Sequence, residues 1–260
     1  MRHRLLLPLV LAIGCSSKSS PPPPQGGTVR IAAASDLSKA FTELGTQFKA
    51  KTGITAQIDF GASGLLAKQI EQGGPFSLFA AANRNFVDQV IKAGKCDAAT
   101  AKSYARGRIV VWTPAGVDKL AKLEDLADPR FKKIAIANPE HAPYGKAAKQ
   151  ALEKSGLWPQ LQDRIVLGEN IQATMRYAID HNADAGIVAL SLAIEHKDGA
   201  YLAIDPELYA PLDQALVVCG GGDGAGFAKQ FADYLFSPEG QQLMGKYGFT
   251  LPDQPAAKTP

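Results

Sequence analysis

The stretch Ile134–Gly145, IAIANPEHAPYG, predicts a short buried strand that runs into a loop and then into a helix. Its first four residues are apolar, whereas the Asn, Pro and Gly residues that follow interrupt regular structure. The run KAAKQALEK at 146–154 restarts the chain as a helix. A helix that begins after such a loop leaves backbone N–H groups without partners at the positive end of its dipole. The stretch therefore predicts an α/β unit whose loop can bind an anion.

The same strand–loop–helix arrangement recurs along the chain. We expect strands at residues 28–34, 54–60, 76–82, 108–113, 134–137, 165–167, 184–189 and 213–219, and helices at residues 38–52, 65–72, 83–93, 98–106, 146–154, 172–180, 225–235 and 237–246. This alternation predicts an α/β fold with mostly parallel sheets and helices on both faces. With 260 residues, the chain is long enough for two domains.

Two serines lie at the first junctions of this kind. Ser35 follows the strand at 28–34, and Ser63 lies between Gly61 and Gly64 after the next strand. Each hydroxyl can cap the helix that follows or donate a hydrogen bond to a ligand, and the sequence leaves both possibilities open. FGASG is one residue too short for the GxSxG elbow that holds a catalytic serine. No His lies near Ser63 in the sequence, so little supports a nucleophilic serine there.

The charge balance argues against a nucleic-acid partner. The formal net charge is +3, and loss of Arg2 and Arg4 with an N-terminal signal would lower it from +3 to +1. Binding to nucleic acid usually requires a clear basic surface.

The N-terminus predicts export and lipidation. MRHR is a basic region, LLLPLVLAI is apolar, and Ala12–Cys15 (AIGC) resembles the lipobox of bacterial lipoproteins. We expect residues 1–14 to be a signal peptide and Cys15 to carry the lipid. Residues 15–27, rich in Ser and Pro, form a tether. The alternative is an ordinary cleaved secretory signal that leaves no anchor. Elsewhere no apolar stretch is long enough to span a membrane as a helix.

Two further cysteines remain, Cys96 and Cys219. Cys96 follows a predicted helix and Cys219 ends a predicted strand, and nothing in the sequence brings them together. The two could pair in an oxidising compartment, but the sequence favours unpaired thiols and leaves the question open. The sequence has no CxxC, HExxH or Cys/His cluster, so we expect no bound metal ion and no cofactor.

Five blocks together resemble a known family. AAASDL, FGASG, IAIANPEHAPYG, GENIQAT and SPEGQQLMGKYGF lie in order between Val29 and Phe249. They resemble the periplasmic molybdate-binding proteins of bacterial ABC importers, the ModA family. The resemblance implies a type II periplasmic-binding-protein fold, in which two crossing strands join two α/β domains around a ligand cleft. Domain I would comprise residues 28–110 and 213–260, and domain II residues 111–212.

The resemblance also implies a site for a tetrahedral oxyanion. In this family hydroxyls and backbone N–H groups hold the anion, so molybdenum is bound only through its oxygens and no metal ligand or catalytic residue is expected. The positions that match are Ser35, Asp36 and Ser63 in domain I, and Tyr144 and Ile171 in domain II. Some members add a tyrosine hydroxyl where this chain has Ala189.

Asp36 does not fit such a site in an obvious way. Molybdate carries no proton near neutral pH and needs donors only, so an inward carboxylate would repel it. Hydrogen phosphate has a proton and would favour a carboxylate acceptor. We expect Asp36 to offer its backbone N–H and to turn its side chain to cap the following helix.

These features predict an extracytoplasmic solute-binding lipoprotein that captures molybdate, and also tungstate. It would be a monomer that delivers the ion to a membrane permease driven by a cytoplasmic ATPase, with a lipid as its only membrane attachment. One alternative is a binder of phosphate or sulfate on the same fold. Another is an exported hydrolase with Ser35 or Ser63 as nucleophile; its few candidate bases are His141, His181 and His196, of which His141 lies near the presumed cleft. A third, a ligand sensor for a membrane kinase, shares all the binding residues.

Overall fold

The computed structural model describes residues 26–220 and 223–251. The predicted signal peptide, Cys15 and the tether up to residue 25 lie outside the described residues. The strands are β1 (Gly27–Ala34), β2 (Ile54–Gly61), β3 (Leu78–Ala81), β4 (Lys102–Gly107), β5 (Ile109–Thr113), β6 (Ile134–Ala137), β7 (Ile165–Gly168), β8 (Ala185–Ala189), β9 (Ala200–Ala203) and β10 (Leu212–Val218).

The α-helices are α1 (Ser38–Thr52), α2 (Ser63–Glu71), α3 (Arg84–Lys92), α4 (Pro143–Lys154), α5 (Trp158–Leu161), α6 (Ile171–Ile179), α7 (Leu190–Ala193), α8 (Asp223–Phe236) and α9 (Pro238–Lys246). Short 3₁₀ turns are η1 (Ser35–Leu37), η2 (Ala98–Thr100), η3 (Leu123–Ala127), η4 (Gln162–Arg164) and η5 (Pro206–Leu208). Within the described ranges, no helix has both the length and the apolar character needed to cross a membrane.

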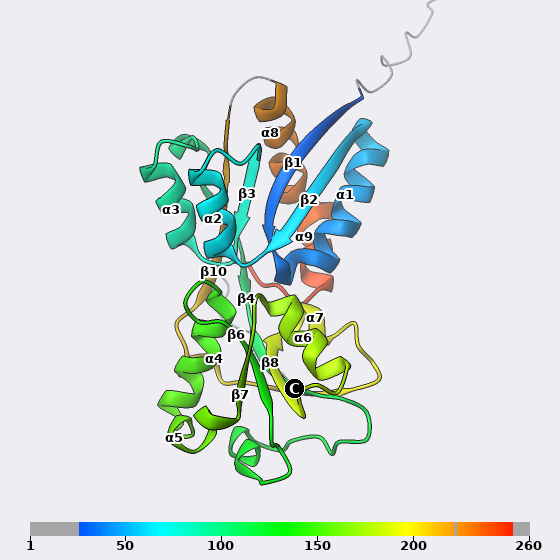
Figure 1. The fold of residues 1–260 in the computed structure, drawn as a ribbon. Helices are drawn as coiled ribbons and strands as arrows, with labels where there is room; N and C mark the ends of the chain where they lie inside the picture. Colours follow the sequence, from blue (N-terminus) through cyan, green and yellow to red (C-terminus); the bar gives the residue numbers. More distant parts are fainter. Residues whose placement is uncertain (1–25, 221–222, 252–260) are drawn as a thin grey trace, which may run out of the picture.

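Two five-stranded sheets divide the molecule into two halves (Figure 1). The first half holds the sheet β2-β1-β3-β10-β4, and the second half holds the sheet β7-β6-β8-β5-β9. The strands of the strand–helix units pair in parallel, β1 with β2 and β3, and β6 with β7 and β8. β10 runs antiparallel to β3 and β4, and β5 runs antiparallel to β8 and β9. The predicted α/β fold is confirmed, and both of its sheets are mixed.

Two adjacent connections join the halves. β4 continues through Arg108 into β5 of the second sheet, and after β9 the chain returns through η5 to β10 of the first sheet. β4 and β10 pair with each other, so the two connections lie side by side between the halves (Figure 1). A pair of neighbouring strands is a narrow link, about which two packed halves can rotate as a hinge.

Helices cover both faces of the first sheet. On one face, Phe231 of α8 lies edge to face against Phe41 and Phe48 of α1. On the other face, α2 and α3 cover Phe79 of β3 and Val217 of β10. Because successive residues of a strand point to opposite faces, β3 and β10 supply apolar side chains to both layers.

Local signals explain where α1 begins and ends. The helix spans Ser38–Thr52 as predicted, and Phe41, Leu44 and Phe48 on its inner face are fully buried. Gly53 ends it in the left-handed conformation, with φ of 77°, which glycine adopts without steric cost.

The predicted helix at residues 98–106 is wrong. η2 covers only Ala98–Thr100, and β4 begins at Lys102. β4 pairs with β10, where Tyr104 donates a hydrogen bond to Gln214, 110 residues later in the chain. Because strand formation depends on partners that are distant in sequence, the local pattern did not reveal it.

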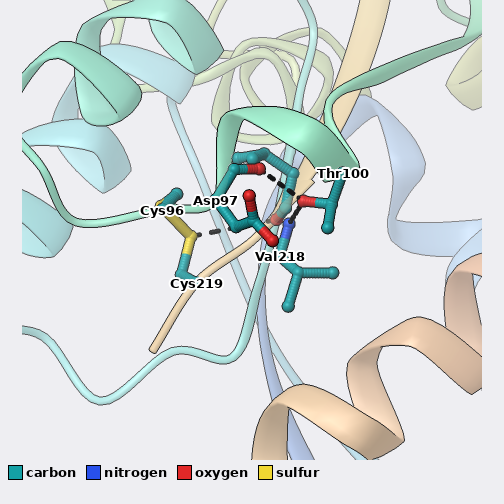
Figure 2. The surroundings of a disulfide bond; sticks show 6 residues. Cys96, Asp97, Thr100, Val218 and Cys219 are labelled. Carbon is teal, nitrogen blue, oxygen red and sulfur yellow. Dashed lines mark hydrogen bonds between the residues drawn. A yellow bond between two sulfur atoms is a disulfide. The ribbon is translucent and has the colours of Figure 1, made fainter. Parts of the chain in front are cut away.

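The expectation of unpaired thiols is also wrong, because Cys96 and Cys219 form a disulfide (Figure 2). Cys219 directly follows β10, and the backbone N–H of Asp97 donates to the carbonyl of Val218 at 2.9 Å. Thr100 Oγ1 accepts from the N–H of Val218 at 2.9 Å, which fixes the same junction (Figure 2). The topology thus brings together two cysteines 123 residues apart. Disulfides of this kind are typical of proteins outside the cytoplasm.

Replacement of both cysteines by serine should lower the free energy of unfolding by about 2–5 kcal/mol, because the bridge restricts the unfolded chain through a long loop. Urea denaturation of the oxidised wild type and of the C96S/C219S variant measures the difference. Reduced wild type is the control and should match the variant. Equal stability of all three samples would contradict the prediction.

Candidate functional site

A small buried pocket lies where the two halves meet. Its empty volume is about 180 Å³, including its mouth, and its walls contain all five residues nominated from the sequence. The first half contributes Ser35, Asp36 and Ser63, and the second half contributes Tyr144 and Ile171. None of the five is more than 3% exposed, so the pocket is shielded from solvent.

Three elements begin at this pocket without a side-chain cap. The residues at the N-cap positions of η1, α2 and α4 are Ala34, Ala62 and Ala142, and none of them accepts a hydrogen bond from its own helix through a side chain. Alanine is a poor residue for this position, where Ser, Thr, Asp and Asn satisfy the first N–H groups. The first backbone donors of these elements therefore remain available to a ligand.

α6 begins at the pocket with a different arrangement. Asn170 caps this helix by accepting from the N–H of Ala173 at 2.9 Å. The cap satisfies the third N–H of the helix, and Ile171, which carries the first, lines the pocket. The predicted helix start at 172 is thus one residue late, and the earlier start places Ile171 at the positive end of the dipole.

The two serine hydroxyls lie in the pocket wall. Ser63 Oγ accepts a hydrogen bond from the backbone N–H of Ala82 at 3.0 Å. Because the oxygen is already an acceptor, the hydroxyl hydrogen is free to donate to a ligand. Ser35 is buried beside it, in the turn that follows β1.

The side chain of Asp36 does not cap a helix, which corrects the expectation from the sequence. Neither η1 nor α1 has a side-chain cap. Instead Asp36 Oδ2 accepts from the hydroxyl of Tyr144 at 2.9 Å and from Nε2 of Gln214. Burial raises the pKa of the Asp36 carboxyl from 3.8 to about 6, although the hydrogen bonds from Gln214 and Tyr144 oppose this shift.

Sequence reasoning missed the residues that hold Asp36 in place. Gln214 Nε2 also donates to the Tyr144 hydroxyl at 3.1 Å, and Gln214 Oε1 accepts from Tyr104 at 2.8 Å. Burial and the neighbouring carboxylate keep the pKa of Tyr144 well above its usual value, so its hydroxyl remains a donor. One signal was present in the sequence: Gln214 follows Asp213 near the start of a strand whose other residues are apolar.

Direct hydrogen bonds close the halves around the pocket. Tyr144 of the second half donates to Asp36 of the first, and the hydroxyl of Ser191 in α7 donates to the backbone carbonyl of Asp36 at 2.8 Å. In the loop before α4, the carbonyl of His141 accepts from the N–H of Gly64 at 2.9 Å. The structure is therefore a closed form in which the first turn of α2 contacts the loop before α4.

The pocket wall carries no cationic side chain. Its polar groups are hydroxyls and backbone amides, and Asp36 is its only ionisable carboxylate. Across residues 26–220 and 223–251, no three His, Cys, Asp or Glu side chains are grouped in a way that could hold a metal ion. The donor set suits an anion.

A larger groove lies beside the pocket, with an empty volume of about 1360 Å³ including open solvent. It runs between the start of α3 and α4, and it is lined by exposed or partly exposed residues such as Asn83, Lys146 and Lys149. It contains none of Ser35, Asp36 and Ser63, so its size does not make it the better candidate.

His141 is not arranged as a catalytic base. Its Nε2 lies 3.0 Å from the backbone carbonyl of Glu169, and its own carbonyl accepts from Gly64. Ser63 Oγ instead pairs with the N–H of Ala82. The geometry described here does not form the serine–histidine pair that a hydrolase requires.

Comparison with known proteins agrees with this geometry. The sequence profile of the family described as "Bacterial extracellular solute-binding protein" matches residues 29–250. The molybdate-binding protein ModA of Rhodobacter capsulatus is 34% identical over 87% of this chain and 90% of its own length. A Bacillus subtilis protein named as a candidate ABC transporter substrate-binding lipoprotein, YvgL, is 30% identical over 94% of this chain and 95% of its own length.

A solved structure extends the similarity to three dimensions. The periplasmic molybdate-binding protein of Azotobacter vinelandii matches with a TM-score of 0.81 and 28% identity, over 86% of this chain and 100% of that one. These relatives are binding proteins rather than enzymes by name. The chain therefore belongs to the bacterial extracellular solute-binding proteins, and among them to the ModA family.

Proposed function

We propose that this protein captures molybdate, and also tungstate, outside the cytoplasm and delivers it to an ABC importer. The observation that carries the proposal is the buried pocket in which hydroxyls and uncapped helix N-termini of both halves converge without a cation. The names of the ModA relatives support molybdate as the ligand.

The residues proposed to bind the anion are the five nominated from the sequence, all of which lie in the wall of the pocket. Ser35 and Ser63 would donate through their hydroxyls, and Tyr144 and Ile171 through their backbone N–H groups. The N–H of Asp36 would complete the set. Neutral donors at the positive ends of helices can hold a dianion without a metal ion or a cofactor. A dry cavity of fixed size would disfavour the smaller sulfate ion.

Closure would couple binding to transport. We take residues 28–110 with 213–260 as one domain and residues 111–212 as the other, connected by the two crossing strands. Because both domains would donate to the anion, the ligand stabilises the closed form, which it binds better than the open form. A membrane permease with a cytoplasmic ATPase would then recognise the closed monomer.

The proposed location depends on residues outside the described part of the chain. Family membership supports a site of action outside the cytoplasm, and the name of the YvgL relative supports a lipoprotein. We propose that Cys15 carries the lipid that is the protein's only membrane attachment. No nucleic acid takes part.

Three alternatives remain testable. A phosphate or sulfate binder would use the same fold, and Asp36 is the feature that favours phosphate. A serine hydrolase is disfavoured because His141 and Ser63 are engaged with other groups. A sensor that signals to a membrane kinase would bind the same ligand through the same residues, so ligand binding does not distinguish it from a transport protein.

Molybdate and tungstate should raise the melting temperature of the purified protein, because a ligand that binds only the folded state adds about 2.7 kcal/mol at 100 times its Kd. A thermal-shift series with molybdate, tungstate, sulfate and phosphate measures this effect. Sulfate and phosphate at equal concentration should cause little change. A shift with phosphate alone would replace molybdate by phosphate as the ligand.

Gly64→Ala should weaken molybdate binding by about 5- to 150-fold, the effect of 1–3 kcal/mol of overpacking. A Cβ at Gly64 would lie 2.9 Å from the carbonyl oxygen of His141, so the added methyl opposes closure. Titration calorimetry measures Kd. Gly45→Ala in α1 is the matched control, because its Cβ would meet Ala56 at an ordinary 3.5 Å. Unchanged affinity of the Gly64 variant would refute the closure model.

Cys15→Ser should release the protein from the membrane in the cells that produce it, because the thiol is the proposed site of lipid attachment. Immunoblots of membrane and soluble fractions provide the measurement. Ser20→Ala in the tether is the control and should remain with the membrane. If the Cys15 variant also remains there, another anchor must exist.

A further inference from the structure

Asp36 is a buried acid with no cation to neutralise it. It is fully buried, and among the side chains whose burial is described, in residues 26–220 and 224–251, no other Asp, Glu, Lys or Arg is buried to this degree. Its hydrogen-bond donors, the Tyr144 hydroxyl and the Gln214 amide, are both neutral. A carboxylate in such surroundings loses its hydration without gaining a compensating charge.

The elements packed around Asp36 bring no buried charge toward it. The charged or titratable groups nearest in these elements are Lys39 and Glu43 in α1, Asp59 in β2, Arg106 in β4, Lys146 in α4, Arg176 and Tyr177 in α6, and Asp213 in β10; all are exposed or partly exposed. The buried titratable groups that interact electrostatically with Asp36 are the hydroxyls of Tyr104 and Tyr144. Neither can neutralise a carboxylate.

The two oxygens of Asp36 have different surroundings. Oδ2 accepts both hydrogen bonds, from Tyr144 and from Gln214, and Tyr104 fixes the Gln214 amide through Oε1. Oδ1 is equally buried and has no partner at hydrogen-bond geometry among the described residues, and the only further donor that acts on the carboxyl, lowering its pKa, is the backbone N–H of Asp36 itself. A neutral carboxylic acid has one oxygen that accepts and one that carries the proton. Because Oδ2 has the role of the acceptor, the proton belongs on Oδ1.

Asp36 also lines the pocket for the oxyanion, beside Ser35 and Ser63. A dianion in this pocket would be repelled by an ionised carboxylate and attracted by a hydroxyl group. Protonation of Asp36 would therefore convert the one unfavourable wall residue into another donor.

We infer that Asp36 is protonated in the anion-bound closed form and donates from Oδ1 to the oxyanion, so that molybdate binding takes up one proton from solvent. This inference rests on the proposed function and adds the protonated Asp36 carboxyl to the groups that would donate hydrogen bonds to the anion. Gln214 and Tyr104 are positioning residues. Gln214 donates to Oδ2 together with Tyr144 and so directs this oxygen away from the anion, and Tyr104 holds the Gln214 amide in place.

The pH dependence follows from the sign of the pKa shift. In the closed form, burial raises the pKa of Asp36 to about 6, and a neighbouring dianion raises it further. Opening exposes the carboxyl, so the ligand-free protein is ionised near neutral pH and must bind a proton together with molybdate. Kd therefore increases by up to about tenfold per pH unit in this range. At a pH below the pKa of the ligand-free protein the acid is already protonated, and the dependence disappears.

The experiment is titration calorimetry of the full chain with molybdate between about pH 6.5 and 8.5, in buffers of different ionisation enthalpy. The expected result for wild type is uptake of about one proton at the upper pH and a Kd that rises with pH. Asp36→Asn retains an acceptor in place of Oδ2 and places an NH₂ donor at Oδ1. This variant should bind molybdate with a pH-independent affinity close to that of wild type at the lower pH.

Asp59→Asn is the matched control, because Asp59 is an exposed carboxylate in the same half and should leave the pH dependence unchanged. Wild type that binds molybdate with constant Kd and no proton uptake would overturn the inference, even if the Asn variant does not fold. A pH dependence that persists in Asp36→Asn would overturn it as well. Absence of molybdate binding at every pH would instead refute the proposed function, and this inference with it. Phosphate binding without proton uptake would indicate an ionised Asp36 that accepts the ligand's own proton.

Discussion

Backbone N–H groups at the start of a helix need partners, and the constraint on which this fold depends is that several of them are left without a side-chain cap at one place. Ala34, Ala62 and Ala142 stand where a helix would normally receive a polar cap, and all three line one pocket. Leaving these donors without a cap costs stability, and the buried inner faces of helices such as α1 and α4 offset that cost. The strand orders of the two sheets direct the N-termini of η1, α2, α4 and α6 toward the junction of the halves, which makes a site from positions that are individually unfavourable.

Much of this arrangement could be predicted, because its signals are local. The start of a helix, the glycine that ends it and the serine after a strand are visible within a few residues, so α1 and the five pocket residues followed from pattern and family resemblance. The features that were predicted wrongly depend on partners that are far away in the sequence. β4 is a strand because β10 pairs with it, and Cys96 meets Cys219 for the same reason. The side chain of Asp36 accepts hydrogen bonds from Tyr144 and Gln214 instead of capping the helix that follows it, and these two donors lie 108 and 178 residues away in the sequence. No window of sequence contains such a pair.

β10 links several of these features. It is a middle strand of the first sheet, it carries Gln214 beneath the pocket, and its end is fastened by the disulfide. Its neighbour β4 supplies Tyr104 to the same amide. The strands about which the halves can turn are thus the ones that hold Asp36 in position. Motion of the halves and the hydrogen bonding of the buried acid are therefore mechanically connected, since opening separates Tyr144 from Asp36 while Gln214 and Tyr104 stay with the first half.

The late position of β10 in the chain has a consequence for biogenesis. β3 and β4 are both made before residue 110, but the strand that pairs with each of them is completed only at Val218. The N-terminus of the chain is synthesised first, so the first sheet cannot be completed until more than 200 residues have been made. The first half therefore stays incompletely folded until β10 has been made. Cys96 and Cys219 can meet only when this strand has paired with its neighbours.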